Sequence, residues 1–170
     1  VGLSSSSRNG VERPAERPAL DDVALVLHTS GTTSRPKRVP LAHRNLTISA
    51  QNIVDTYQLS SEDVSLCVMP LFHVHGVVAS TLSTLHSGGT VVVPPRFNAL
   101  NFWPVAREHG VTWFSAVPSM HQALLSRAQR GGGAGTGYDG LRFVRSCSAA
   151  LPSSTMLGME ERFGVPMLEA

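Results

Sequence analysis

The sequence predicts an α/β fold in which strands and helices alternate around a largely parallel sheet. Short apolar runs alternate with segments of helical periodicity, and glycines or prolines separate most of them. Of the 170 residues, 42% are hydrophobic and 15% are charged, which is typical of one globular domain with a real core. Ligands of parallel sheets bind beyond the carboxyl ends of the strands, so the loops there are the expected place of a functional site.

The first 20 residues differ in composition from the rest of the chain. They are rich in serine, arginine and proline and hold too little apolar surface to form a core. Residues 1–20 are therefore expected to be a flexible linker or disordered tail, and residues 21–170 the folded domain. The sequence has no initial methionine and stops directly after an apolar stretch, so both ends are expected to be cut from a longer protein.

The apolar run Val23–Leu27 predicts a first strand over residues 22–28, buried on both faces because no polar residue interrupts it. An amphipathic helix over residues 43–57 follows from the helical spacing of Leu46, Ser49, Ala50, Ile53, Val54 and Tyr57. Further strands are expected at residues 64–69, 90–93, 111–116, 141–144 and 165–168. Further helices are expected at residues 76–86, 101–109, 118–130 and 153–163, with a glycine-rich loop over residues 131–140.

Charge and cysteine content exclude several classes of protein. The net charge of +2 is spread along the chain without a run of Lys or Arg, so nucleic acid is not an expected partner. The apolar runs are too short to form a transmembrane segment, and no secretory signal is visible. Cys67 and Cys147 form no CxxC pair and fit reduced thiols, so an intracellular location, cytoplasmic or peroxisomal, is expected.

The stretch Thr29–Lys37 has the chemistry to hold a polyphosphate. Gly31 allows the backbone to approach a ligand closely, and Lys37 adds a compact positive charge. Hydroxyl donors to an oxyanion come from Ser30, Thr32, Thr33 and Ser34, and Thr29 begins the stretch. The same composition also fits a plain flexible loop, and the spacing is not that of the Walker pattern.

The loop Pro70–Gly76 carries two histidines beyond the second strand. His73 and His75 are two residues apart, so they would face opposite sides of an extended loop and make a poor metal-binding pair. No residue of the chain is assigned as a metal ligand. Each histidine also fits a core or capping role.

Two later loops carry further candidates. Ser119 and His121 lie at a helix start, where anions are favoured, although capping by Ser119 beside an exposed His121 explains the pattern equally well. The loop Arg145–Pro152 is rich in small residues, which would let a flat ring lie against the backbone or would simply form a tight turn.

Together these stretches resemble the adenylate-forming superfamily of acyl-CoA synthetases, beetle luciferases and peptide-synthetase adenylation domains. Residues 29–37 are similar to its phosphate-binding signature, with Ser34 and Arg38 where glycines are usual. The loop Pro70–Gly76 matches its Pro-x-x-His-x-x-Gly pattern, which implies that His73 lies beside the carboxylate being activated. The resemblance places the nucleotide also against Ser148, Ala149, Ala150 and Glu169.

Within that superfamily the combination is most similar to the oxalate–CoA ligases of plants and fungi. The resemblance implies that a carboxylate attacks the α-phosphorus of ATP to form an acyl-adenylate and pyrophosphate, with Mg²⁺ sharing the phosphate charge. The thiol of CoA then displaces AMP. The second carboxylate of oxalate would need donors, and the expected ones are His73, His75, Ser119, His121 and Arg145.

The resemblance also implies an incomplete enzyme. The superfamily continues beyond the position of Ala170 with a Tyr-x-Met-Thr-Glu stretch, a ribose-binding aspartate, a hinge and a C-terminal catalytic lysine. A portion of an AMP-binding domain, inactive by itself, is therefore expected. The alternatives are a non-catalytic nucleotide-binding fragment and an acyl-CoA synthetase for a medium-chain or aryl acid.

Overall fold

The computed structural model describes residues 17–29, 36–130 and 138–170. Five parallel strands form the main sheet in the order β4-β3-β5-β6-β7. The strands are β3 (Val64–Cys67), β4 (Thr90–Val92), β5 (Trp113–Ala116), β6 (Phe143–Ser146) and β7 (Met167–Glu169). The predicted α/β fold with a parallel sheet is therefore confirmed.

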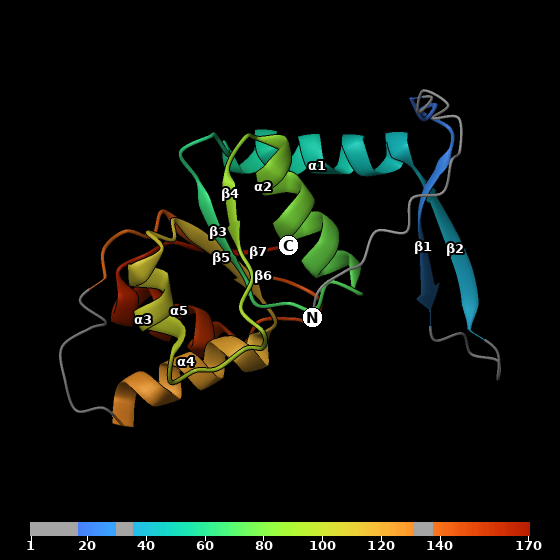
Figure 1. Cartoon of the computed structure of the whole chain (residues 1–170). Coiled ribbons are helices and arrows are strands. Elements are labelled where there is room, and N and C mark those ends of the chain that lie inside the picture. The colour runs from blue at the N-terminus through green and yellow to red at the C-terminus, as the bar shows by residue number, and fades with distance from the viewer. Residues whose placement is uncertain (1–16, 30–35, 131–137) are drawn as a thin grey trace, which may run out of the picture.

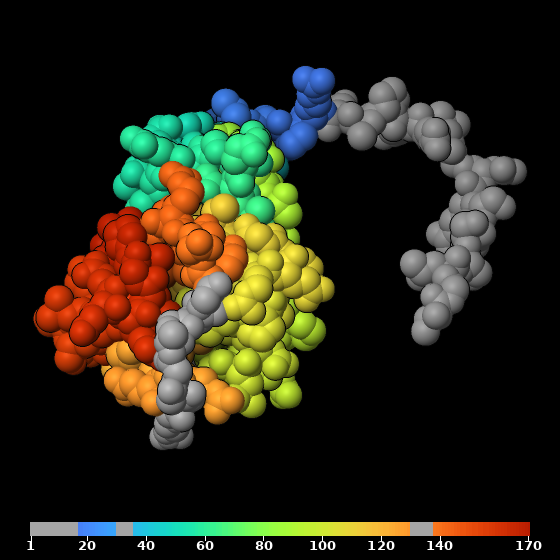
Figure 2. All heavy atoms as spheres, turned by 90° about the vertical axis from the view of Figure 1, so that its left-hand side faces the viewer, coloured from blue at the N-terminus to red at the C-terminus, as the bar shows by residue number. Residues whose placement is uncertain are grey.

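Helices cover both faces of this sheet (Figure 1). One layer consists of α3 (Phe102–Glu108), α4 (Pro118–Arg130) and α5 (Ser153–Phe163). The other consists of α1 (His43–Tyr57), the π-helix η1 (His75–Leu82) and α2 (Ser83–His86). Figure 2 shows α1, in teal, above the red C-terminal segment. The predicted helices over residues 43–57, 118–130 and 153–163 match the observed ones, whereas the helix predicted over residues 76–86 begins as a wider π-helix.

The predicted first strand is present, but its predicted burial on both faces is wrong. β1 (Val23–Thr29) pairs antiparallel with β2 (Lys37–Ala42), and the two form a ribbon separate from the parallel sheet. Val23 is 59% exposed and Val26 is 45% exposed, so the run is not buried on both faces. An apolar run indicates that both faces of a strand could be buried. It does not show which elements, if any, pack against those faces. Pro40 is tolerated in β2 because a two-stranded ribbon leaves one edge of each strand unpaired.

The core has one apolar cluster on each face of the sheet. Side chains alternate along β5 and β6, so Trp113 and Phe143 face α1 while Phe114 and Val144 face the layer of α3, α4 and α5. On the α1 face the rings of Trp113, Phe143 and Tyr57 form a continuous stack, with centroids 5.3 Å apart at both steps. No helix in the part of the chain that the structure describes is long and apolar enough to cross a membrane.

Asp63 ties together the amino-terminal ends of four strands. Its fully buried carboxylate accepts hydrogen bonds from Thr112 Oγ1 at 2.7 Å, Arg142 Nη1 at 2.6 Å and the Ser60 N–H at 2.8 Å. Its carbonyl accepts the N–H of Thr90 at 2.8 Å. These partners precede β5 and β6 and begin β4, while Asp63 itself leads into β3. Desolvation raises the pKa of Asp63, but the bonds from Arg142, Thr112 and Ser60 outweigh it, so the pKa lies below its ordinary value.

We expect Asp63→Asn to lower the free energy of unfolding by about 2–3 kcal/mol, because the change leaves buried donors without a charged acceptor. Arg142 is 43% exposed, which keeps the loss below that of a fully buried pair. Because the folded pKa is the lower one, the contribution is present above the ordinary carboxyl pKa and is lost as pH falls through the folded value. Urea unfolding measures this, with Asp55→Asn on the exposed side of α1 as the matched control. Equal losses in both variants would contradict the role given to Asp63.

Candidate functional site

The carboxyl ends of β3, β5 and β6 bring a polar cluster to the α1 face of the sheet. Ser115 and Arg145 are partners in the β5–β6 register, so their side chains lie side by side on the same face as Trp113 and Phe143. His75, at the start of η1, reaches the same place from the loop after β3. The cluster consists of His75, Ser115, Arg145, Cys147 and Ser148.

Arg145 is a buried cation, only 9% exposed. Its Nε donates to the Tyr57 hydroxyl at 3.0 Å and its Nη1 to Ser115 Oγ at 3.1 Å, and the guanidinium lies 5.7 Å from the centre of the Tyr57 ring. Among the described residues no carboxylate pairs with Arg145, and its Nη2 makes no hydrogen bond. The cluster therefore holds an uncompensated positive charge with one terminal nitrogen still able to donate.

His75 is neutral at neutral pH. Burial, followed by the nearby charges of Arg145, His121 and His73, lowers its pKa to about 4. Its Nε2 lies 2.7 Å from Ser115 Oγ and its Nδ1 lies 3.1 Å from Ser148 Oγ. Ser115 Oγ accepts from Arg145 and keeps its own hydrogen, which it can donate to His75 Nε2 in the tautomer that carries the ring hydrogen on Nδ1. In that tautomer Nδ1 donates to Ser148 Oγ.

The turn after β6 lies beside this histidine. Cys147 Sγ is 3.2 and 3.4 Å from the two ring nitrogens of His75, so the thiol faces the ring rather than either N–H. Ser148 has a left-handed backbone with φ of 75°, which is strained for a residue with a side chain. The exposed turn is tied to β7 because Glu169 Oε1 accepts the N–H of Leu151 at 2.7 Å.

The loop Pro70–Gly76 separates its two histidines. A Cβ atom at Gly76 would lie 2.8 Å from the carbonyl oxygen of Met69, so only glycine allows η1 to begin against that backbone. His73 is exposed and its ring packs against Phe72, with centroids 4.6 Å apart, whereas His75 is buried. The catalytic role of His73 remains a prediction. Its side chain is exposed, so a ligand could reach it.

The structure does not bring Ser119 and His121 into the cluster. Ser119 is exposed in the first turn of α4. His121 is fully buried against Phe114, on the opposite face of the sheet from Arg145, and its Nε2 lies 3.2 Å from the carbonyl oxygen of Ala116. The alternative of an exposed His121 is therefore wrong. Burial lowers its pKa to about 4 against the opposing effect of the Ala116 and Arg145 carbonyls. The substrate roles of both residues stay predictions.

Two members of the arrangement were missed in the sequence. Ser115 is a polar residue inside an apolar strand and Tyr57 is the last residue of α1, and neither pattern by itself indicates a site. The predicted phosphate-binding residues Ser30, Gly31, Thr32, Thr33 and Ser34 lie outside the described residues. Thr29 and Lys37, which flank them, are partners in the β1–β2 ribbon.

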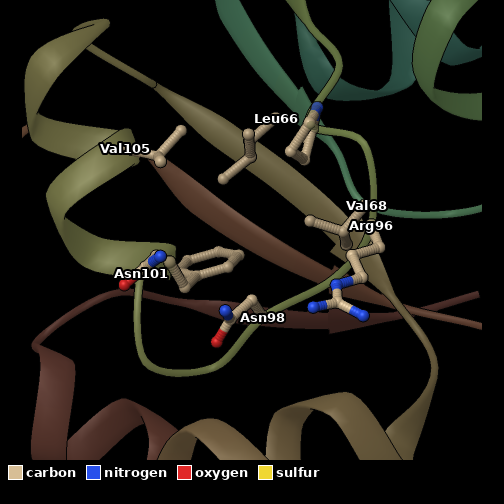
Figure 3. A pocket seen from close by; sticks show the side chains of 8 residues that line it. Leu66, Val68, Arg96, Asn98, Asn101 and Val105 are labelled. Carbon is tan, nitrogen blue, oxygen red and sulfur yellow. The ribbon is translucent and has the colours of Figure 1, made fainter.

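A small hollow of about 40 Å³ lies on the opposite face of the sheet, between β3 and α3 (Figure 3). Its apolar lining includes Leu66, Val68 and Val105, and Arg96 and Asn98 lie on the loop beside it. It shares no residue with the His75–Arg145 cluster, so the hollow and the cluster are separate features on opposite faces of the sheet.

Comparison with known proteins gives one family and a consistent set of relatives. Residues 3–170 match the AMP-binding enzyme family. An oxalate–CoA ligase of Arabidopsis thaliana is 49% identical over 152 residues, which are 88% of this chain and 29% of the relative. An oxalate–CoA ligase of Saccharomyces cerevisiae is 46% identical over 149 residues, 88% of this chain and 26% of the relative. This chain thus spans less than a third of the length of either relative.

A solved structure agrees with these relatives. It is a malonyl-CoA ligase in a ternary product complex with methylmalonyl-CoA and AMP, and it superposes with a TM-score of 0.80 at 30% identity. The match covers 92% of this chain and 34% of that one.

We expect the free energy of unfolding to fall as pH drops from 6.5 towards 4, because His75 and His121 take up protons in this range only when unfolded. His121→Gln removes one of the two histidines that take up a proton on unfolding. The free energy of unfolding should then fall about half as steeply with pH, and the variant should lose up to about 2 kcal/mol less than the wild type near pH 5. Urea unfolding near pH 7 and near pH 5 measures it. His109→Gln, at an exposed histidine, is the control. An unchanged slope in His121→Gln would rule out its burial as a neutral ring.

Proposed function

The chain belongs to the AMP-binding enzyme family, and from this premise we propose that it is part of an AMP-forming acid–CoA ligase whose acid substrate is oxalate. The observation that carries the proposal is Arg145, a buried guanidinium without an acidic partner among the described residues and with Nη2 free to donate. A buried charge is costly unless it is paired, and a ligand carboxylate would supply the missing partner. Arginine suits this task because its planar donors match the geometry of a carboxylate.

A small diacid fits this cluster better than a long or aromatic acid. One carboxylate of the substrate has to be activated, and the second would pair with Arg145. Neutral His75 and the hydroxyl of Ser115 keep the surroundings polar without adding charge. An apolar tail would leave Arg145 unpaired, which disfavours that substrate. Two relatives at 46–49% identity are named for oxalate, a dicarboxylate, and the malonyl-CoA ligase is named for the thioester of another, which supports the same choice.

The nucleotide would lie beyond the carboxyl ends of the strands. The turn of Ser148, Ala149 and Ala150 is exposed, so a flat adenine ring could lie against it, and Glu169 Oε1 holds that turn through the Leu151 N–H. The loop 29–37 would hold the β- and γ-phosphates, and Lys37 would add its charge. Mg²⁺ bound to these phosphates would offset part of their charge.

His73 would lie beside the reacting carboxylate, since it is exposed at the loop that leads to His75. In the complete protein a carboxylate oxygen of the acid would attack the α-phosphorus of ATP, and pyrophosphate would leave. The thiol of CoA would then attack the acyl carbon, and AMP would leave. The part of the described residues in this reaction is to bind and orient the acid and to neutralise its second charge.

The complete protein that contains this chain should catalyse ATP–pyrophosphate exchange with oxalate, more weakly with malonate, and not with a medium-chain or aryl acid. Arg145→Met should lower kcat/KM for oxalate by about 100-fold, because it removes the partner of a buried carboxylate. Arg96→Met, the same change at an exposed arginine on the opposite face, is the control. Exchange with a longer acid but not with oxalate would refute the proposed substrate.

A further inference from the structure

We propose that Tyr57 and Ser115 are positioning residues that orient the Arg145 guanidinium so that Nη2 faces the second carboxylate of the acid. This inference rests on the proposed function for the identity of the ligand. Neither residue is assigned a role by the resemblance or by the comparisons. Both act through Arg145 and not on the reacting atoms.

Two of the three guanidinium nitrogens are already fixed. Nε donates to the Tyr57 hydroxyl at 3.0 Å, and Nη1 donates to Ser115 Oγ at 3.1 Å. A guanidinium is planar, so two bonds from different nitrogens determine both its plane and its rotation within that plane. The direction in which Nη2 points therefore follows from the positions of Tyr57 and Ser115.

Tyr57 is held through both its ring and its backbone. Its ring stacks on Phe143, and Phe143 stacks on the fully buried Trp113. Its backbone carbonyl and that of Gln58 accept hydrogen bonds from Arg142 Nη2 at 3.4 and 3.2 Å. Arg142 is in turn bound to Asp63. The phenol hydroxyl thus has a fixed position at the end of α1, relative to the sheet that carries Arg145.

Ser115 is held in the same way by the sheet. It is fully buried in β5, and its hydroxyl lies between Arg145 Nη1 and His75 Nε2. Because no surface of Ser115 is open to solvent, the second carboxylate of the acid would contact Arg145 and not this hydroxyl. The pair therefore stiffens the guanidinium, which lowers the entropic cost of binding an anion to a flexible side chain.

Tyr57→Phe tests the proposal in the complete protein, because it removes one hydroxyl and keeps the aromatic stack. We expect KM for oxalate to rise about 10-fold, which corresponds to one hydrogen bond to a charged group, while KM for ATP changes by less than about twofold. Ser115→Ala should likewise raise KM for oxalate and leave KM for ATP nearly unchanged. Tyr138→Phe is the matched control, since its hydroxyl bonds to the Val111 carbonyl and not to the cluster.

A second measurement does not depend on turnover. In ¹⁵N-labelled protein the Arg145 Nε–H signal should exchange with solvent about 10-fold faster in Tyr57→Phe than in the wild type, with no such change in Tyr138→Phe. An unchanged exchange rate together with an unchanged KM for oxalate would overturn the positioning role. Wild-type protein without any exchange activity towards oxalate would instead overturn the proposed function, and the Nε–H signal would still decide the orientation of Arg145.

Discussion

The buried carboxylate of Asp63 is the interaction on which the rest of the structure depends. It binds Thr112, Arg142 and Ser60 through its side chain and Thr90 through its carbonyl. A carboxylate removed from water is stable only when hydrogen bonds and an opposite charge replace the lost hydration. Because Thr112 and Arg142 directly precede β5 and β6, satisfying this charge sets the relative positions of β3, β5 and β6, and the bond from Thr90 to the Asp63 carbonyl adds β4. The same Arg142 also binds the carbonyl oxygens at the end of α1 and so connects this constraint to Tyr57.

Arg142 and Arg145 are three residues apart, but only Arg142 has its charge balanced by a carboxylate among the described residues. Arg142 is partly exposed and paired with Asp63, which makes it a structural residue. Arg145 is buried with hydroxyls and an aromatic face around it but without a carboxylate among the described residues. Burial without a counter-charge is unfavourable in the absence of a ligand and becomes favourable when an anion binds. The difference between the two lies in their neighbours and not in their residue type.

Helix boundaries and the parallel sheet were predictable because they depend on local patterns. The amphipathic spacing in residues 43–57 and the proline or glycine at helix ends are read directly from adjacent residues. β2 was missed because Lys37, Arg38 and Pro40 are poor strand formers, and they are extended only because β1 pairs with them. The site prediction likewise included His75, Arg145 and Ser148, but it could not separate them from Ser119 and His121, which face elsewhere.

The sequence by itself determined the fold class, the alternation of helices and strands after residue 42 and the family, because these depend on periodicity and on contiguous motifs. Only the tertiary structure decided which polar side chains meet. Tyr57 and Arg145 are 88 residues apart, and His75 and Ser148 are 73 apart, yet both pairs are within hydrogen-bonding distance. Such contacts follow from strand register and from the docking of α1 on the sheet, and neither is recorded in any short stretch of sequence. The same is true of Arg145, whose lack of a carboxylate partner among the described residues follows from the packing around it and not from any adjacent residue.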